Sequence, residues 1–123
     1  MKSILIVDDS PTMRRMVKAS LRDLKDIICN EAASGLEAIE QLALARSDLI
    51  ILDLNMPDMH GLDVLRFVRG HDAYRDVPIL ILTTRDDKEG KDLALAAGAS
   101  LYLTKPFSPQ FLATHVRELL HIY

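Results

Sequence analysis

Residues 48–61 read DLIILDLNMPDMHG, a short apolar run that stops at Asp53. Uninterrupted runs of Ile and Leu are typical of strands buried on both faces, as in a parallel sheet with helices on both sides. Three further runs have this form: Ile4–Val7 before Asp8 and Asp9, Ile79–Leu82 before Thr83, and Leu101–Leu103 before Thr104 and Lys105. Because parallel strands end at one edge of a sheet, where open α/β sheets bind ligands, we expect these polar side chains to meet there.

The segments between the runs carry helix signals. Their expected starts are Ser10 with Pro11, Ser34 with Glu37, Gly61, Asp86 with Asp87 in the first turn, and Ser108 with Pro109. The apolar residues on the helical faces are Met13, Met16, Val17, Leu21, Leu36, Ile39, Leu42, Leu62, Leu65, Phe67, Val68, Leu112, Val116, Leu119 and Leu120. Gly98 suits the end of the fourth helix. With residues 26–31 as a second strand, the chain reads as five βα units, and the strand-like runs disfavour an all-helical bundle.

Composition limits the classes of protein to consider. The chain has 123 residues, which predicts a single domain over 1–123. A net charge of −3 offers no broad attraction for nucleic acid or anionic membranes, so the basic residues of the first helix are expected to form a solvated face (Arg14, Arg15, Lys18, Arg22). Cys29 is the only cysteine, which excludes a disulfide framework and predicts a small core residue. Without a membrane-length run or a signal peptide, we expect a cytoplasmic protein.

The pieces ILIVDDS, DLIILDLNMPDMHG, VPILILTT and LYLTKPF occur in this order along the chain. Together they resemble the receiver domain of two-component response regulators, from Ile4 to the last helix. The start SPTMRRMV is most similar to the single-domain chemotaxis regulators of that family. The resemblance implies a flavodoxin-like fold, a doubly wound five-stranded parallel sheet in the order 2-1-3-4-5 with five helices. Met1 and the first helix favour a complete single-domain protein over a piece of a larger regulator.

The resemblance also implies a phosphoacceptor and a Mg²⁺ site. Asp53 matches the carboxylate that accepts the phosphoryl group. Asp8 and Asp9 match the acidic pair that holds Mg²⁺ with Asp53, Asp9 directly and Asp8 largely through water. The main-chain carbonyl of Asn55 matches the position that completes the metal site.

Further roles are carried over for residues near the last two strands. Thr83 matches the hydroxyl that binds a phosphoryl oxygen, and Lys105 the lysine that pairs with the phosphoryl group. Tyr102 matches the switch aromatic that turns inward when Thr83 is drawn to the phosphoryl group, and Pro106 a proline after a cis peptide bond. The residues that set the lifetime of the phosphoryl group are Asn55, Thr84 and Arg85, and we expect slower hydrolysis than in the chemotaxis relatives.

Physical chemistry explains why these residue types belong together. Phosphoryl transfer depends on positioning and on neutralising charge. Two unit charges about 4 Å apart interact by roughly 4 kcal/mol at an effective dielectric constant of 20, so the crowded carboxylates repel one another strongly. Mg²⁺ prefers carboxylate, carbonyl and water oxygens and would relieve that repulsion, while Lys105 adds a second positive charge.

Rival functions can be weighed on the same residues. Aspartyl-phosphate phosphatases of the haloacid-dehalogenase type use D-x-D, whereas this chain has Asn55 at the second position, and an amide cannot shuttle a proton. The glycine-rich phosphate loops of nucleotide-binding modules are missing from the sequence. A phosphorelay intermediate stays open. We therefore expect no enzyme, only Mg²⁺-dependent self-phosphorylation and slow autodephosphorylation.

The expected partners follow from the resemblance. A sensor histidine kinase would supply the phosphoryl group. A downstream protein, with the flagellar motor switch as one candidate, would bind the face of the fourth helix, fifth strand and fifth helix around Lys88, Lys91 and Arg117. We expect a monomer that binds neither nucleic acid nor membranes.

Overall fold

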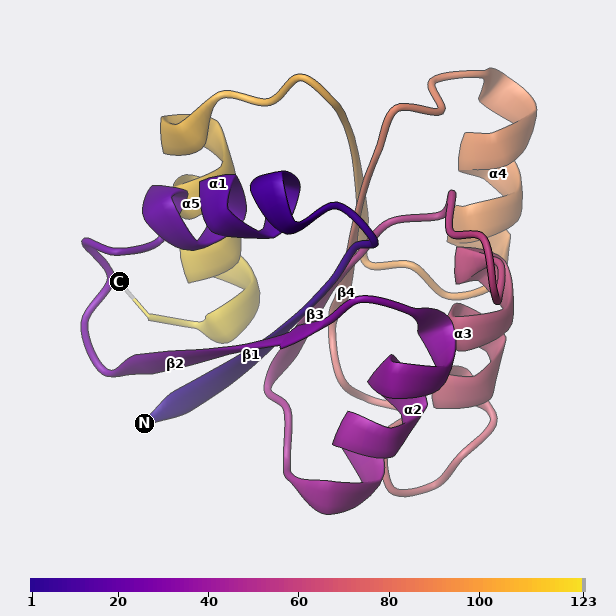
Figure 1. The fold of residues 1–123 in the computed structure, drawn as a ribbon, viewed down its shortest axis with the longest axis horizontal. Helices are drawn as coiled ribbons and strands as arrows, with labels where there is room; N and C mark the ends of the chain where they lie inside the picture. Colours follow the sequence, from indigo (N-terminus) through magenta and orange to yellow (C-terminus); the bar gives the residue numbers. More distant parts are fainter. Residues whose placement is uncertain (123) are drawn as a thin grey trace.

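The computed structural model describes residues 1–122 and alternates strands with helices along the chain (Figure 1). The elements are β1 (Lys2–Val7), α1 (Pro11–Ser20), β2 (Ile27–Ala32), α2 (Gly35–Leu44), β3 (Leu49–Leu52), α3 (Gly61–Arg69), β4 (Ile79–Thr83), α4 (Lys88–Ala96), β5 (Leu101–Thr104) and α5 (Pro109–Leu120). All strand pairs are parallel, in the order β2-β1-β3-β4-β5. The predicted doubly wound fold and strand order are confirmed.

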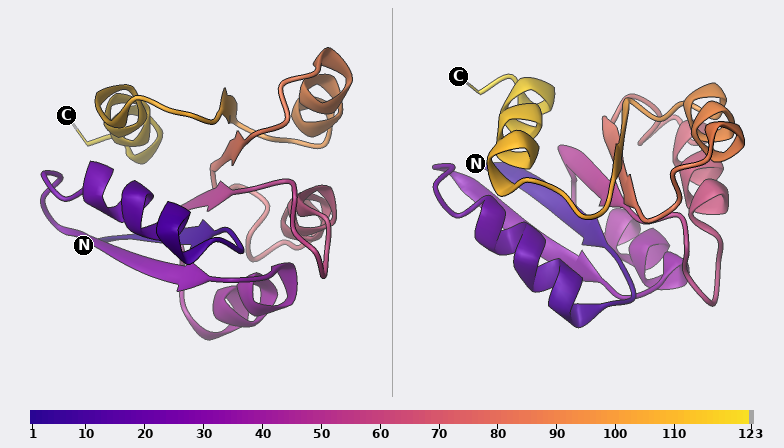
Figure 2. Two further views of the ribbon diagram at one scale, coloured as in Figure 1. Left: turned by 45° about the horizontal axis from the view of Figure 1, so that its top comes forward. Right: turned by 90° about the horizontal axis from the view of Figure 1, so that it is seen from above.

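Helices cover both faces of the sheet (Figures 1 and 2). On β3, Ile50 and Leu52 pack in one apolar layer with residues of α2, α3 and α4. Leu49 and Ile51 point the other way, into a layer with α1 and α5. Because both faces of β3 are buried, its sequence is apolar without alternation.

The helix starts are capped by the predicted residues in most cases. The hydroxyl oxygens of Ser10, Ser34 and Ser108 accept hydrogen bonds from backbone N–H groups at 3.1–3.3 Å. The helix α4 differs, because Asp87 is its N-cap, so Asp86 and Asp87 precede the helix instead of lying in its first turn. After α4, Gly98 has φ +110°, a backbone conformation that favours glycine.

Two apolar residues assigned to helical faces lie on the surface. Met16 and Leu36 are both exposed. On α1 the buried stripe runs through Val17 and Leu21, and Met16, one residue earlier, is rotated away from it. Strand β2 is also displaced by one residue from the predicted 26–31.

Cys29 is half-buried beside the α1 and α5 layer, and this burial raises the pKa of its thiol, with Lys18 opposing the shift. Within residues 1–122, no helix combines the length and the apolar character that a membrane crossing requires.

Candidate functional site

The polar residues after four strands meet at the carboxyl edge of the sheet. Asp8 follows β1, Asp53 follows β3, Thr83 ends β4 and Lys105 follows β5. These four strands are consecutive neighbours in the sheet, so residues up to 97 positions apart in sequence come into contact. The structure thus brings together the side chains that the sequence placed at one edge.

Lys105 joins two of the carboxylates. Its Nζ lies 2.7 Å from Asp8 Oδ2 and 3.4 Å from Asp53 Oδ2. The Lys105 side chain is only 9% exposed, and both carboxylates are buried. Its backbone N–H donates to the carbonyl of Thr83 at 2.7 Å, and its peptide bond to Pro106 is cis, as the resemblance implied. A buried cation therefore lies directly against the proposed phosphoacceptor.

The acidic residues form a cluster with the composition of a site for a hard cation. Asp8, Asp9 and Asp53 each offer a carboxylate oxygen, and these oxygens lie within 4.8 Å of one another. Both carboxylate oxygens of Asp8 are engaged, one by Lys105 and the other by the N–H of Ser10 at 2.9 Å. Asp9 is exposed. An all-oxygen donor set of this charge fits Mg²⁺, and Asp9 with Asp53 would supply the direct carboxylate ligands.

Asn55 connects the phosphoacceptor loop with the end of β4. Its N–H donates to Asp53 Oδ1 at 3.2 Å. Its side-chain amide donates to Thr83 Oγ1 at 3.4 Å and to Thr84 Oγ1 at 3.3 Å. Thr83 is fully buried, whereas Thr84 is exposed. Two of the predicted lifetime residues, Asn55 and Thr84, therefore contact each other beside Asp53.

Arg85, the third of the predicted lifetime residues, is directed toward α4. Its Nε forms an ion pair with Asp87 Oδ1 at 2.7 Å, and this contact lowers the pKa of Asp87. The guanidinium also lies so close to Gly90 in α4 that a Cβ there would be 2.4 Å from Nε. The Arg85 charge is thus held on the α4 side by the helix cap, and its place beside the path of an attacking water stays a prediction.

The side chain predicted to act as the aromatic switch is buried in this structure. Tyr102 donates its hydroxyl to the carbonyl oxygen of Arg85 at 2.5 Å. Burial raises the pKa of that hydroxyl, Arg85 opposes the shift, and Asp87 and Asp86 add to it. The N–H of Arg85 in turn donates to Thr83 Oγ1 at 3.4 Å. Thr83 and Tyr102 are therefore linked through the backbone of one residue.

Two contacts at this edge were not foreseen. Arg14, assigned to a solvated face, is only 15% exposed and donates from Nη1 to the carbonyl oxygen of Asp8 at 2.6 Å. Asp58 accepts from the N–H groups of Gly35 and Leu36, each at 3.2 Å, and so ties the loop after Asp53 to α2. One feature of the sequence could have indicated that Arg14 is paired and not solvated. Glu31 is a carboxylate inside a predicted strand, next to the first helix.

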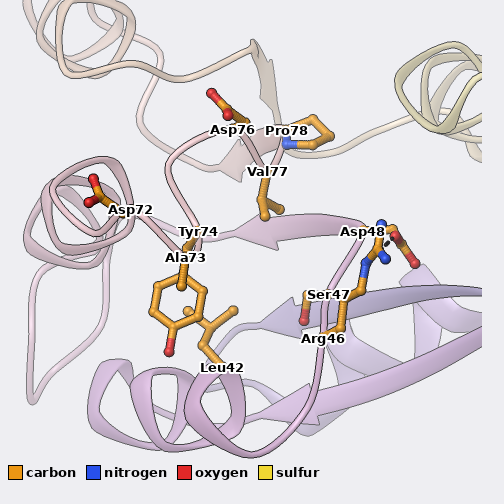
Figure 3. Close-up of a pocket in the computed structure, with 10 residues that line it drawn as sticks. All are labelled: Leu42, Arg46, Ser47, Asp48, Asp72, Ala73, Tyr74, Asp76, Val77 and Pro78. Atoms are coloured by element: carbon orange, nitrogen blue, oxygen red, sulfur yellow. Dashed lines mark ion pairs between the residues drawn. The ribbon is translucent and has the colours of Figure 1, made fainter.

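A hollow of about 570 Å³ lies at the opposite, amino edge of the sheet (Figure 3). Its walls are Leu42 of α2, the α2–β3 loop and the α3–β4 loop, lined by Arg46, Ser47, Asp48, Asp72, Ala73, Tyr74, Asp76, Val77 and Pro78. Arg46 pairs with Asp48 at 3.3 Å within it. The predicted site residues lie at the other edge and do not line this hollow.

Comparison with known proteins gives a consistent result. The model of the response regulator receiver domain matches residues 4–117. Chemotaxis protein CheY1 of Helicobacter pylori is 42% identical over 120 residues, which span 95% of this chain and 95% of that protein.

Solved structures agree with this. The structure of chemotaxis protein CheY4 of Vibrio cholerae superimposes with a TM-score of 0.88 and 39% identity, covering 97% of this chain and 98% of that chain. The Mn²⁺-bound form of the response regulator Rcp1 gives a TM-score of 0.84 at 28% identity, covering 97% of this chain and 91% of that chain.

Receiver domains take a phosphoryl group from a histidine kinase, act on downstream targets and bind Mg²⁺ in an acidic pocket, for which this chain has the cluster Asp8, Asp9 and Asp53. The chain belongs to the family of response regulator receiver domains, which are phosphorylation-activated signalling switches.

Proposed function

We propose that Asp53 accepts a phosphoryl group from the phosphohistidine of a sensor kinase, and that the added charge changes the affinity for a downstream protein. One observation carries this proposal. The buried Asp53 carboxylate lies 3.4 Å from the buried Lys105 ammonium and belongs to a cluster of carboxylate oxygens within 4.8 Å of one another. Negative charge is thus concentrated at a point that already holds one counter-cation.

The residues divide the work of phosphoryl transfer. A carboxylate oxygen of Asp53 forms the new bond to phosphorus while the bond from phosphorus to the histidine nitrogen breaks. Lys105 neutralises charge on the phosphoryl oxygens, and the Thr83 hydroxyl donates to one of them. Asp9, Asp53 and the Asn55 carbonyl would hold Mg²⁺ directly and Asp8 through water, and the ion when bound would supply further charge neutralisation. The Mn²⁺-bound Rcp1 structure supports a divalent cation in this fold.

The contacts around Thr83 suggest how a phosphoryl group on Asp53 would change the structure. The Thr83 hydroxyl oxygen accepts a hydrogen bond from the Arg85 N–H, and the Arg85 carbonyl oxygen accepts one from the Tyr102 hydroxyl. A Thr83 hydroxyl drawn toward a phosphoryl oxygen would therefore weaken its contact with Arg85. The loop before α4 and the Tyr102 ring would then shift together. The phosphoryl group acts by favouring one of two arrangements, and about 1.4 kcal/mol changes their ratio tenfold.

The output surface is the face of α4, β5 and α5. Its exposed cations on α4 are Lys88 and Lys91. Arg117, which was expected on the same face, instead lines a groove between α1 and α5. Exposed apolar side chains on α4 and α5, Leu93 and Phe111, could contribute contact area. We propose that a protein target, a flagellar motor switch in the first place, binds there.

The chemotaxis relatives support a role in motility signalling inside the cytoplasm. We propose that the chain acts as a switch and not as an enzyme, apart from its own phosphorylation and slow dephosphorylation. A phosphorelay intermediate would use the same Asp53 but pass the group to a second histidine.

The test is labelling by acetyl phosphate followed by intact-protein mass spectrometry. We expect one added phosphoryl group in the presence of Mg²⁺ and none in excess chelator. Incubation with a histidine phosphotransfer protein then separates the two fates, because a relay intermediate transfers the group and a terminal switch keeps it. Labelling at full rate in chelator would contradict the Mg²⁺-dependent scheme.

A further inference from the structure

Arg14 connects three elements at the metal-binding edge. From α1, its Nη1 donates to the carbonyl oxygen of Asp8, after β1, at 2.6 Å. Its Nε donates to Glu31 Oε1 on β2 at 2.8 Å. The side chain is mostly buried, so the guanidinium is fixed by both contacts at once. A planar fork of donors is what lets one side chain hold two acceptors in set directions.

We propose that Arg14 is a positioning residue for the divalent cation, with Glu31 as its counter-charge, an inference that rests on the metal site of the proposed function. Arg14 holds the peptide group that joins Asp8 to Asp9. The Asp9 side chain is attached directly after that peptide group. Fixing the carbonyl therefore fixes the direction in which Asp9 leaves the loop.

The different surroundings of Asp8 and Asp9 show why this anchor matters. Asp8 is held through its N–H by Ala32, through Oδ1 by Ser10 and through Oδ2 by Lys105. The Asp9 carboxylate makes no hydrogen bond or ion pair with any residue in 1–122. A ligand without side-chain partners is oriented by its backbone alone, and partners of ligands are the usual means of fixing metal sites.

Glu31 offsets the positive charge that Arg14 places beside the metal site. A guanidinium beside the acidic cluster repels an incoming divalent cation. The Glu31 carboxylate accepts from Arg14 and, at 3.3 Å, from Lys18, and the bond from Arg14 lowers the pKa of Glu31, which burial opposes. Glu31 thus stays charged around neutral pH and offsets the Arg14 charge while the hydrogen bond to Asp8 is kept.

Positioning and plain charge predict opposite results for removal of Arg14. If Arg14 acted only through its charge, Arg14→Met would remove a repulsive cation and tighten Mg²⁺ binding. If Arg14 positions Asp9, the same change weakens binding, by about tenfold on the scale seen for residues that orient metal ligands. Arg14→Lys keeps the charge but cannot hold both acceptors in one plane, so positioning predicts weaker binding for this variant as well.

The experiment measures Mg²⁺ affinity of the full chain by NMR titration of backbone amide shifts. The matched control is Arg15→Met on the same helix, because Arg15 is exposed and its guanidinium has Thr12, at 3.5 Å, as its one hydrogen-bond partner within residues 1–122. We expect weaker Mg²⁺ binding in Arg14→Met and Arg14→Lys and an unchanged dissociation constant in Arg15→Met. Equal or tighter binding in the Arg14 variants overturns the proposal, as does equal weakening in Arg15→Met.

A second measurement separates positioning from loss of stability. In Mg²⁺-free buffer, the Ser10 amide, which donates to Asp8 Oδ1, should exchange its hydrogen faster in the two Arg14 variants than in wild type. The amides in the middle of β3 should keep their protection in these variants. Unchanged exchange at Ser10 in both Arg14 variants counts against the proposal. If wild-type protein gives no saturable Mg²⁺ shift, the proposed metal site itself is wrong, which is distinguishable from a failure confined to Arg14.

Discussion

The two edges of the sheet contain the same residue types in very different surroundings. At the carboxyl edge, Asp8 and Asp53 are buried and share Lys105, whose side chain is 9% exposed. At the amino edge, beside the hollow of Figure 3, Asp48 pairs with an Arg46 side chain that is 87% exposed. Asp48 is itself only 13% exposed, but water surrounds Arg46 and screens this pair, whereas water hardly reaches Lys105 and its two carboxylates. Burial, and not the presence of acids and bases, therefore marks the edge that can respond to a new charge.

Replacing one carboxylate at each edge tests this contrast most strongly. We expect Asp53→Asn to abolish labelling by acetyl phosphate, because the amide cannot act as the nucleophile. Asp72→Asn, at the amino edge, should leave labelling unchanged. Intact-protein mass spectrometry measures both. Persistent single labelling of Asp53→Asn would move the phosphoacceptor to another residue.

Replacing one cation at each edge tests the cost of an unbalanced buried charge. Lys105→Met leaves two neighbouring buried carboxylates without their cation, and we expect the free energy of unfolding to fall by about 3 kcal/mol in Mg²⁺-free buffer. Arg46→Met should change it by less than about 0.5 kcal/mol. Urea unfolding followed by circular dichroism gives both values. Similar losses would show that the two edges do not differ energetically.

Mg²⁺ should stabilise through the carboxyl edge alone. At a hundred times its dissociation constant, the ion should add about 2.7 kcal/mol to the free energy of unfolding. Asp9→Ala should remove this gain, yet equal or exceed wild type in stability without Mg²⁺, because it relieves repulsion. Asp76→Ala, beside the Figure 3 hollow, should keep the full gain. Urea unfolding with and without Mg²⁺ tests the set, and a gain retained in Asp9→Ala would exclude Asp9 as a ligand.

The contrast between edges also shows what the sequence could reveal. Strand ends were visible as apolar runs stopping at Asp8, Asp53 and Thr83, because burial on both faces removes all alternation. The meeting of these polar side chains at one edge of the sheet followed from the positions of the strand ends. The long-range partner of Arg14 did not, because a helix surface and a neighbouring strand come together only in the folded chain.

The exposure of Met16 and the direction of Arg85 depend on features that the hydrophobic pattern of the sequence does not show. Composition places Met on an apolar face, but the α1 stripe is narrow and centres on Val17. Arg85 turns to Asp87 because that carboxylate caps α4 two residues later. Neither preference is encoded in local periodicity.

Removing the Thr83 hydroxyl should impair the switch while leaving phosphoryl transfer to Asp53 largely intact. We expect Thr83→Ala to accept a phosphoryl group on Asp53 but to lose most of the gain in partner affinity, about tenfold if one or two hydrogen bonds carry it. Titration of a partner with wild type and variant, each with and without beryllofluoride, measures the gain. Equal gains in both proteins would show that the signal takes another route.

The smallest effect is expected inside the carboxyl edge, on the lifetime of the phosphoryl group. Thr84 accepts from the Asn55 amide at 3.3 Å beside Asp53, so Thr84→Ala frees that amide and opens the approach for water. Loss of one hydrogen bond of about 1 kcal/mol corresponds to roughly fivefold faster hydrolysis. Arg85→Glu should change the rate less, because the Arg85 guanidinium is already held by Asp87. The decay of the phosphorylated mass after acetyl phosphate is removed distinguishes them, and a larger effect of Arg85→Glu would mean that its charge reaches Asp53 after all.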